Sequence, residues 1–92
     1  MPTICMFYGI IIRMMFLDNQ QHSLLHIHVE YQSENVVISM PEGGLLEGRL
    51  PGKKLKLVQA WIAIHEEELM ADWALAIKGE PILKIEPLRK ED

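Results

Sequence analysis

The segment Leu25-His-Ile-His-Val-Glu-Tyr31 alternates strictly between apolar and polar side chains. Its odd-numbered positions are apolar, whereas His26, His28 and Glu30 occupy the even-numbered ones. Because successive side chains of a β-strand point to opposite faces, this pattern predicts a strand with one core face and one polar face. Antiparallel neighbours are expected, since antiparallel sheets commonly bury only one face.

Other β-rich segments flank this strand, with turn-forming residues between them. Residues 3–17 are rich in β-branched and aromatic types and contain Gly9, which predicts a bent or bulged strand followed by a polar loop. Further strands are predicted at 35–40 and 45–50, each preceded by a turn. With the strand at 25–31, these segments predict a three- to four-stranded antiparallel β-meander.

Residues 53–78 contain no glycine or proline, and Gly79 with Pro81 forms a stop signal directly after them. Apolar residues recur there at helical spacing, which predicts one long C-terminal helix that covers the sheet. Residues 79–92 are expected to pack as an extended tail. The predicted fold class is therefore α+β. The side chains expected to be buried together are those of Ile27, Val29, Val37, Val58, Ile62 and Leu69.

The 92 residues, 49% of them hydrophobic, suffice for one packed core, so we expect a single domain over residues 1–92. A formal net charge of −4 argues against broad binding to a nucleic-acid backbone. Cys5 is the only cysteine, which fits a reducing compartment. The apolar run at 4–17 is too short for a membrane helix and lacks the flanks of a signal peptide, so a cytoplasmic location is expected.

Short segments spread over nearly the whole chain are together similar to one known family. They are Pro2-Thr-Ile, Phe7-Tyr-Gly-Ile, Ile12-Arg-Met-Met-Phe, a His-x-His-Val-x-Tyr strand, Leu46-Glu-Gly-x-Leu-Pro, and a helix ending near Trp73 with Gly-Glu-Pro and Lys-Ile-Glu-Pro-Leu beyond it. In this order they resemble the small bacterial family known as domain of unknown function 4160. The resemblance implies a component of a two-gene, toxin-antitoxin-like module, with a small neighbour-encoded protein as partner.

The histidine segment departs from the pattern of that family. The family typically has His-x-Pro-Pro-His-Phe-His-Val, whereas this chain has His22-Ser-Leu-Leu-His26-Ile-His28-Val. Two prolines would stiffen the turn that positions the first histidine. Their absence weakens the case for a functional role of His22 more than it does for His26 or His28.

His26 and His28 project side by side at roughly 6 to 7 Å, a spacing that suits two imidazoles on one zinc-like ion. The third ligand would be His22, Glu30 or His65. The favoured interpretation is a solvated polar face of an antiparallel strand, so no cofactor is expected.

A metal-free alternative is a ribonuclease-type toxin in which His26 and His28 act as general acid and base. Arg13 would stabilise an anionic transition state in such a site. An acidic chain is a poor candidate nuclease, and Arg13 has a carboxylate such as Glu30 as an alternative partner. These observations argue against an enzyme more than for one, and the sequence alone does not decide the question.

A basic cluster flanks the start of the predicted helix, where free backbone N–H groups and the helix dipole favour anions. Its members, Arg49, Lys53, Lys54 and Lys56, are the candidates for contact with an acidic partner or with nucleic acid. No aromatic residue interleaves them to stack on bases, so a nucleic-acid-contacting regulator is not favoured.

Trp61 and Trp73 are twelve residues apart, about 120° around one helix, so we expect one of them to be exposed. Tryptophan is enriched in binding hot spots, which makes both residues interface candidates. Six methionines add adaptable apolar surface. The favoured hypothesis is a small protein-interaction module that binds a neighbour-encoded protein, forms a homo-oligomer, or does both.

Overall fold

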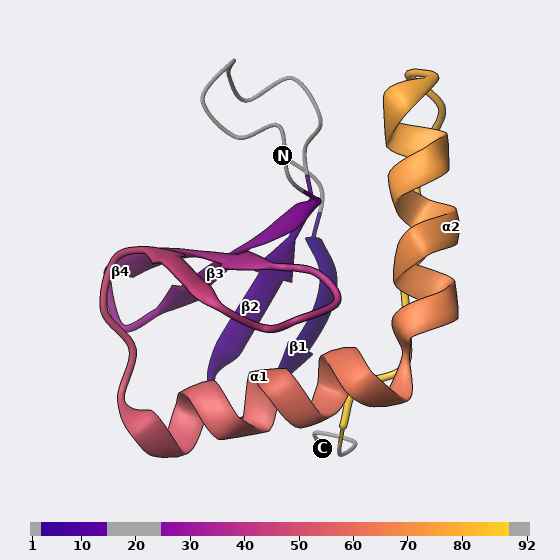
Figure 1. Ribbon diagram of the computed structural model, residues 1–92. Helices are drawn as coiled ribbons and strands as arrows, with labels where there is room; N and C mark the ends of the chain where they lie inside the picture. The colour runs from indigo at the N-terminus through magenta and orange to yellow at the C-terminus, as the bar shows by residue number, and fades with distance from the viewer. Residues whose placement is uncertain (1–2, 15–24, 89–92) are drawn as a thin grey trace.

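The computed structural model describes residues 3–14 and 25–88, in which five strands precede two helices (Figure 1). The strands are β1 (Thr3–Phe7), β2 (Ile10–Arg13), β3 (His26–Tyr31), β4 (Glu34–Ser39) and β5 (Leu45–Glu47). All neighbours pair antiparallel, and the order across the sheet follows the order in the chain. The α+β class and the antiparallel meander are confirmed, but the prediction of three to four strands is wrong.

The fifth strand arises because the segment predicted as one bent strand contains a hairpin. Tyr8 and Gly9 connect β1 to β2, with φ angles of 51° and 77°. A two-residue turn that follows the strand twist needs positive φ at both central positions, and Gly9 adopts it without steric cost. Tyrosine is an unusual first residue for this turn, which is why the hairpin was not expected. Residues 15–17 of the predicted strand lie outside the described part of the chain.

The predicted single helix at 53–78 is also wrong, because the segment forms α1 (Gly52–Ile64) and α2 (Glu66–Ile77). Figure 1 shows that α1 runs along one end of the strands and that α2 turns steeply away from it. The two helices meet at His65, whose φ of −112° and ψ of 28° depart from helical values.

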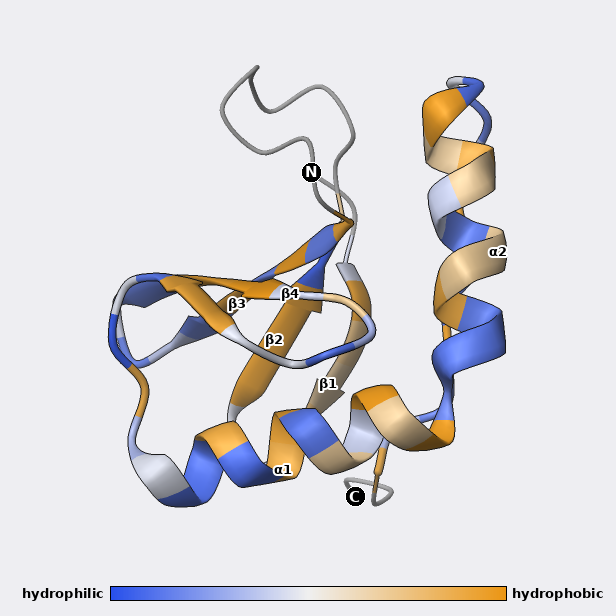
Figure 2. Cartoon of the chain, in the orientation of Figure 1, coloured by the Kyte–Doolittle hydropathy of each residue, from blue (hydrophilic) through white to orange (hydrophobic). Residues whose placement is uncertain are grey.

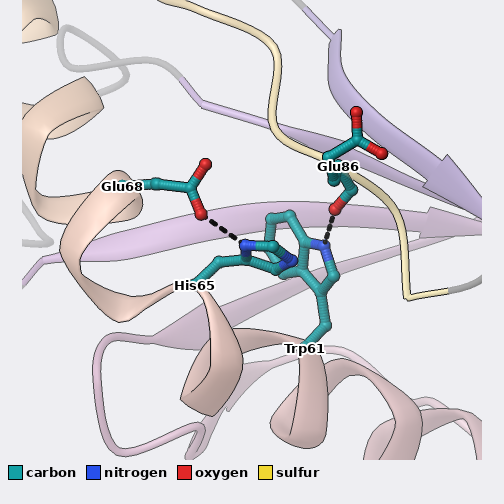
Figure 3. A network of polar contacts seen from close by, with 4 residues as sticks. All are labelled: Trp61, His65, Glu68 and Glu86. Atoms are coloured by element: carbon teal, nitrogen blue, oxygen red, sulfur yellow. Dashed lines mark hydrogen bonds and ion pairs between the residues drawn. The ribbon is translucent and has the colours of Figure 1, made fainter.

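A small polar network surrounds this junction (Figure 3). The His65 ring lies 5.6 Å from the Trp61 ring, and its Nδ1 atom is 2.5 Å from Oε1 of Glu68. Glu66, Glu67 and Glu68 fill the first turn of α2, where carboxylates interact favourably with the helix dipole. This hydrophilic stretch is visible at the start of α2 in Figure 2. The acidic triplet therefore marks a new helix start.

The main core lies between α1 and one face of the sheet. The aromatic rings of Phe7 and Trp61 are 5.9 Å apart in it, and both side chains are fully buried. All six residues predicted as core are buried, but Val37 lies on the opposite face from Ile27, because it pairs with His28. Neither α1 nor α2, the helices found in the described ranges, has the length and apolar content needed to cross a membrane.

Residues 79–88, the described part of the tail predicted at 79–92, contain no helix or strand, and residues 89–92 lie outside the described chain. The backbone N–H of Ile85 donates to the carbonyl of Ile4 at 3.0 Å, so the tail lies against the edge of β1. Trp61 Nε1–H donates to the carbonyl of Glu86 at 2.8 Å (Figure 3). The tail thus closes one edge of the sheet.

Candidate functional site

The sheet face that points away from α1 carries the polar positions of the strands. Directly opposite residues in antiparallel strands share a face, so the register arranges side chains in rows across the sheet. One row runs through Arg13, His28, Val37 and Glu47. The next row contains Met6, Ile11, Glu30 and Asn35.

Members of both rows line a hollow of about 390 Å³ on this face of the sheet, which we call the open face. Its lining residues are Arg13, His28, Val29, Glu30, Asn35, Val36, Val37 and Glu47. Nη2 of Arg13 lies 3.4 Å from Oε1 of Glu30, and 32% and 41% of the two side chains are exposed. The pairing of Arg13 with Glu30 that the sequence suggested is therefore confirmed. At this exposure such a pair contributes about 0 to 1 kcal/mol to stability, so it orients the two groups more than it stabilises the fold.

His26 begins β3, and its side chain is fully buried on the same side of the sheet as the open face. Its ring lies 5.4 Å from the ring of Trp73 and 5.2 Å from that of His28. The polar face predicted for β3 is thus correct for the half-buried His28 and Glu30 but wrong for His26. The reason is that α2 brings Trp73 over the start of the strand. Both tryptophans are buried, so the expectation that one is exposed is also wrong.

The separation of His26 and His28 remains compatible with two ligands of one ion, but a third ligand is needed. Within residues 3–14 and 25–88, no group of three or more His, Cys, Asp or Glu side chains is placed to hold a metal. Glu30 contacts Arg13, and His65 lies at the helix junction beside Glu68. His22, the remaining candidate, lies outside the described residues.

The four residues of the basic cluster at the start of α1 do not form one exposed surface, because Lys54 packs against the sheet. Nζ of Lys54 donates to the carbonyl of Tyr8 at 3.1 Å and lies 5.2 Å from the centroid of the Tyr31 ring. This lysine therefore ties α1 to the β1–β2 turn, which explains one of the positive charges at a helix end where the dipole disfavours them. The exposed residues of the cluster are Arg49, Lys53 and Lys56.

The strand β5 lies within the strand predicted at 45–50, but none of its residues was a candidate site residue. All three of its residues are exposed, and Leu45 and Leu46 are large apolar side chains with 44% and 37% of their surface accessible. The last position of β5, Glu47, also lines the hollow. A Leu-Leu pair in a strand signals one exposed leucine, because neighbours point to opposite faces. In β5 both leucines are exposed, and the strand order places them at the edge of the sheet.

Besides His26, the described residues include two buried titratable groups outside the hollow, Asp72 and Cys5. Asp72 on α2 is 2% exposed; its Oδ1 accepts a hydrogen bond from the backbone N–H of Leu83 at 3.0 Å, whereas Oδ2 has no partner. Burial raises the pKa of Asp72 above its usual value, and the negative charge of Glu68 adds to this effect. Burial also raises the pKa of Cys5 to about 11.

Comparisons of the whole chain with curated proteins and with solved structures gave no match. The model of the family described as "Domain of unknown function (DUF4160)" matches residues 9–74. This range holds β2 to β5, all of α1 and most of α2, and with them the hollow on the open face. The match covers well over half of the chain and agrees with the resemblance found in its short segments. The chain therefore belongs to the domain of unknown function 4160 family.

Proposed function

We propose that this chain is a small protein-interaction module and one component of a bacterial two-gene, toxin-antitoxin-like system. The proposal rests on a difference between the two edges of the sheet: the tail contacts the β1 edge, whereas the β5 edge is exposed. The tail hydrogen-bonds to the edge of β1 through Ile85 and Ile4, and α1 packs on one face. The opposite edge, β5, is exposed along its whole length beside the hollow. We refer to β5 and the hollow together as the docking surface.

An edge strand offers unpaired backbone groups to a strand of another protein, and this pairing is a common mode of peptide recognition. Leu45 and Leu46 add exposed apolar area at the same edge. A partner that extends the sheet beyond β5 also reaches the side chains of the hollow. Backbone pairing then supplies affinity, and the hollow supplies specificity.

The charges of the hollow favour a protein partner over a phosphate backbone. Arg13 is paired with Glu30, and Glu47 adds a second carboxylate to the lining. A partner of mixed charge complements such a surface, whereas a nucleic acid would meet an excess of negative charge. The ribonuclease alternative receives less support, because Trp73 covers the side chain of His26.

The proposal is tested by co-expressing the chain with the protein encoded by the neighbouring gene. The two should co-purify, and Leu46→Lys should weaken their affinity at least about tenfold, because a lysine on an edge strand opposes strand addition. Ile77→Lys is the matched control: it places the same charge at a side chain that is 50% exposed at the end of α2. It should leave the affinity unchanged.

A toxin-antitoxin role makes a further demand on the same pair of proteins. Expression of one member alone should arrest growth, and co-expression of the other should relieve the arrest. Leu46→Lys should then abolish the relief, whereas Ile77→Lys should preserve it. Failure to co-purify with the neighbour-encoded protein, together with the absence of growth arrest and relief, would contradict the proposed function.

A further inference from the structure

A row of paired residues on the open face ends at Glu47. From β2 to β5 the row contains Arg13, His28, Val37 and Glu47. Because β5 is the last strand of the sheet, a strand added by a partner would supply the next position of this row. Directly opposite side chains on neighbouring strands share a face, with Cβ atoms about 5 Å apart. The partner residue opposite Glu47 therefore faces the hollow.

The charge of the hollow selects the type of this partner residue. Among the described residues that line it are one guanidinium, on Arg13, and two carboxylates, on Glu30 and Glu47. The guanidinium lies 3.4 Å from Glu30 on the inner strands β2 and β3, whereas Glu47 is exposed on the edge strand. The whole chain also carries a net charge of −4. A cationic side chain is therefore the complement of the β5 end of the hollow.

The lining of the hollow beside Glu47 also suits a long basic side chain. Val37 lies directly opposite Glu47, lines the hollow and is 8% exposed. Lysine and arginine pack their methylene stems on apolar surface while the charged head group stays near a carboxylate. An acidic partner residue at this position would instead meet a like charge directly opposite, which destabilises strand pairing.

The opposite face of β5 is matched by an apolar side chain. Leu45 lies opposite Ile38, a fully buried core residue, and is itself 44% exposed. The β4 partners of Leu45 and Glu47 are consecutive residues, so the two side chains point to opposite faces of the sheet. An apolar partner side chain beside Leu45 would remove this leucine from water at the margin of the core.

We propose that the partner strand which adds to β5 places a lysine or arginine beside Glu47, on the open face, and an apolar side chain beside Leu45, on the face covered by α1. This inference rests on the proposed function, because it names the chemistry of the segment that the docking surface binds. The segment is an extended one, basic on one face and apolar on the other.

Glu47→Gln tests the basic contact, because it removes the charge and preserves the size of the side chain. The variant should bind the neighbour-encoded protein with a dissociation constant about fivefold higher than that of the wild type, as expected for loss of an opposite-charge pair across two strands. Its affinity should also depend less on salt concentration. Glu80→Gln is the matched control: it removes the same charge at an exposed glutamate beyond α2, and it should leave both quantities unchanged.

A double-mutant cycle identifies the basic residue itself. Each lysine and arginine of the neighbour-encoded protein is replaced in turn by glutamine, and its affinity is measured for the wild-type chain and for Glu47→Gln. One replacement should weaken binding to the wild type about fivefold and have no further effect on Glu47→Gln, because the same pair is already lost. If no lysine or arginine is coupled to Glu47 in this way, the inference is overturned.

Leu46→Lys separates failure of the inference from failure of the proposed function. If Leu46→Lys weakens binding but Glu47→Gln does not, β5 is the docking site and only the assignment of a basic partner residue is wrong. If neither variant changes the affinity, or if the neighbour-encoded protein does not bind the wild type, both the docking surface and the inference are wrong.

Discussion

Replacing Trp61 by phenylalanine tests how the C-terminal tail is held on the body of the protein. The indole is fully buried, and its Nε1–H donates to the carbonyl of Glu86 at 2.8 Å. Phenylalanine preserves an aromatic ring beside Phe7, 5.9 Å away in the native core, but removes the donor and part of the ring volume.

The expected cost of Trp61→Phe has two parts. Loss of a hydrogen bond to a backbone carbonyl lowers the free energy of unfolding by about 1 kcal/mol. The smaller ring leaves unfilled space in a fully buried site, which adds roughly 1 kcal/mol. The free energy of unfolding should therefore fall by about 2 kcal/mol, as measured by urea denaturation.

Hydrogen exchange provides the local readout, because the Ile85 amide donates to the carbonyl of Ile4 only while the tail is docked. In Trp61→Phe this amide should exchange about tenfold faster than in the wild type. Val58→Ala is the matched control: it also removes volume from a fully buried α1 side chain, at a cost of about 2 kcal/mol, but it does not alter the bond to the tail. Equal exchange of the Ile85 amide in the two variants would refute this account of tail docking.

Three further predictions concern single positions. The pKa of Asp72 is raised in the folded state, so the contribution of its carboxyl group to stability is lost as pH rises through the folded-state pKa. From about pH 4 upward, the wild type should therefore lose stability relative to Asp72→Asn in urea titrations. Parallel pH profiles of the two proteins would contradict this. Gly48→Ala should lower the free energy of unfolding by about 2 kcal/mol or more, because φ is 89° and a Cβ would lie 2.5 Å from the carbonyl oxygen of Asn35. Gly52 is the matched control, since a Cβ there would have nothing within 4 Å. In thermal melts Gly52→Ala should be neutral or stabilising. The Cys5 thiol, 6% exposed with a pKa of about 11, should resist a thiol reagent at pH 8 and react readily once urea unfolds the chain; rapid native labelling would argue against its burial.

The meander was predictable because its central strand carries an unambiguous alternation. Ile27 and Val29 on one side and Glu30 on the other already assign the two faces of β3. The burial of His26 was not predictable in this way, since alternation separates the faces of a strand without revealing which second element covers the polar one. Only the turn of α2 brings Trp73 to that position.

The break between α1 and α2 was not predicted from the spacing of apolar residues, although other features of the sequence indicate it. Residues 53–78 lack glycine and proline, so the apolar stripe favoured a single helix. Two observations indicate otherwise: three consecutive glutamates follow His65, as is typical of a helix start, and Trp61 and Trp73 do not share a face of one straight helix. Two helices at a steep angle bury both tryptophans and resolve the conflict.

The hollow on the open face was predictable only in part. Arg13, His28 and Glu30 were recognised by residue type and by their position on predicted strands. Asn35 and Glu47 join them through the strand register, which depends on turn lengths that the sequence does not specify uniquely. The exposed leucines of β5 likewise become meaningful only once β5 is known to be the edge.

Hydrogen exchange of the complex with the neighbour-encoded protein tests the docking surface most directly. On binding, amides of β5 and of the adjoining β4 should gain protection, while those at the end of α2, around Ile77, should exchange as in the free chain. A footprint centred on 34–39 and 45–47 is the predicted result. A complex that protects α2 and leaves β5 unchanged would contradict the assignment of the open sheet edge as the site of protein interaction.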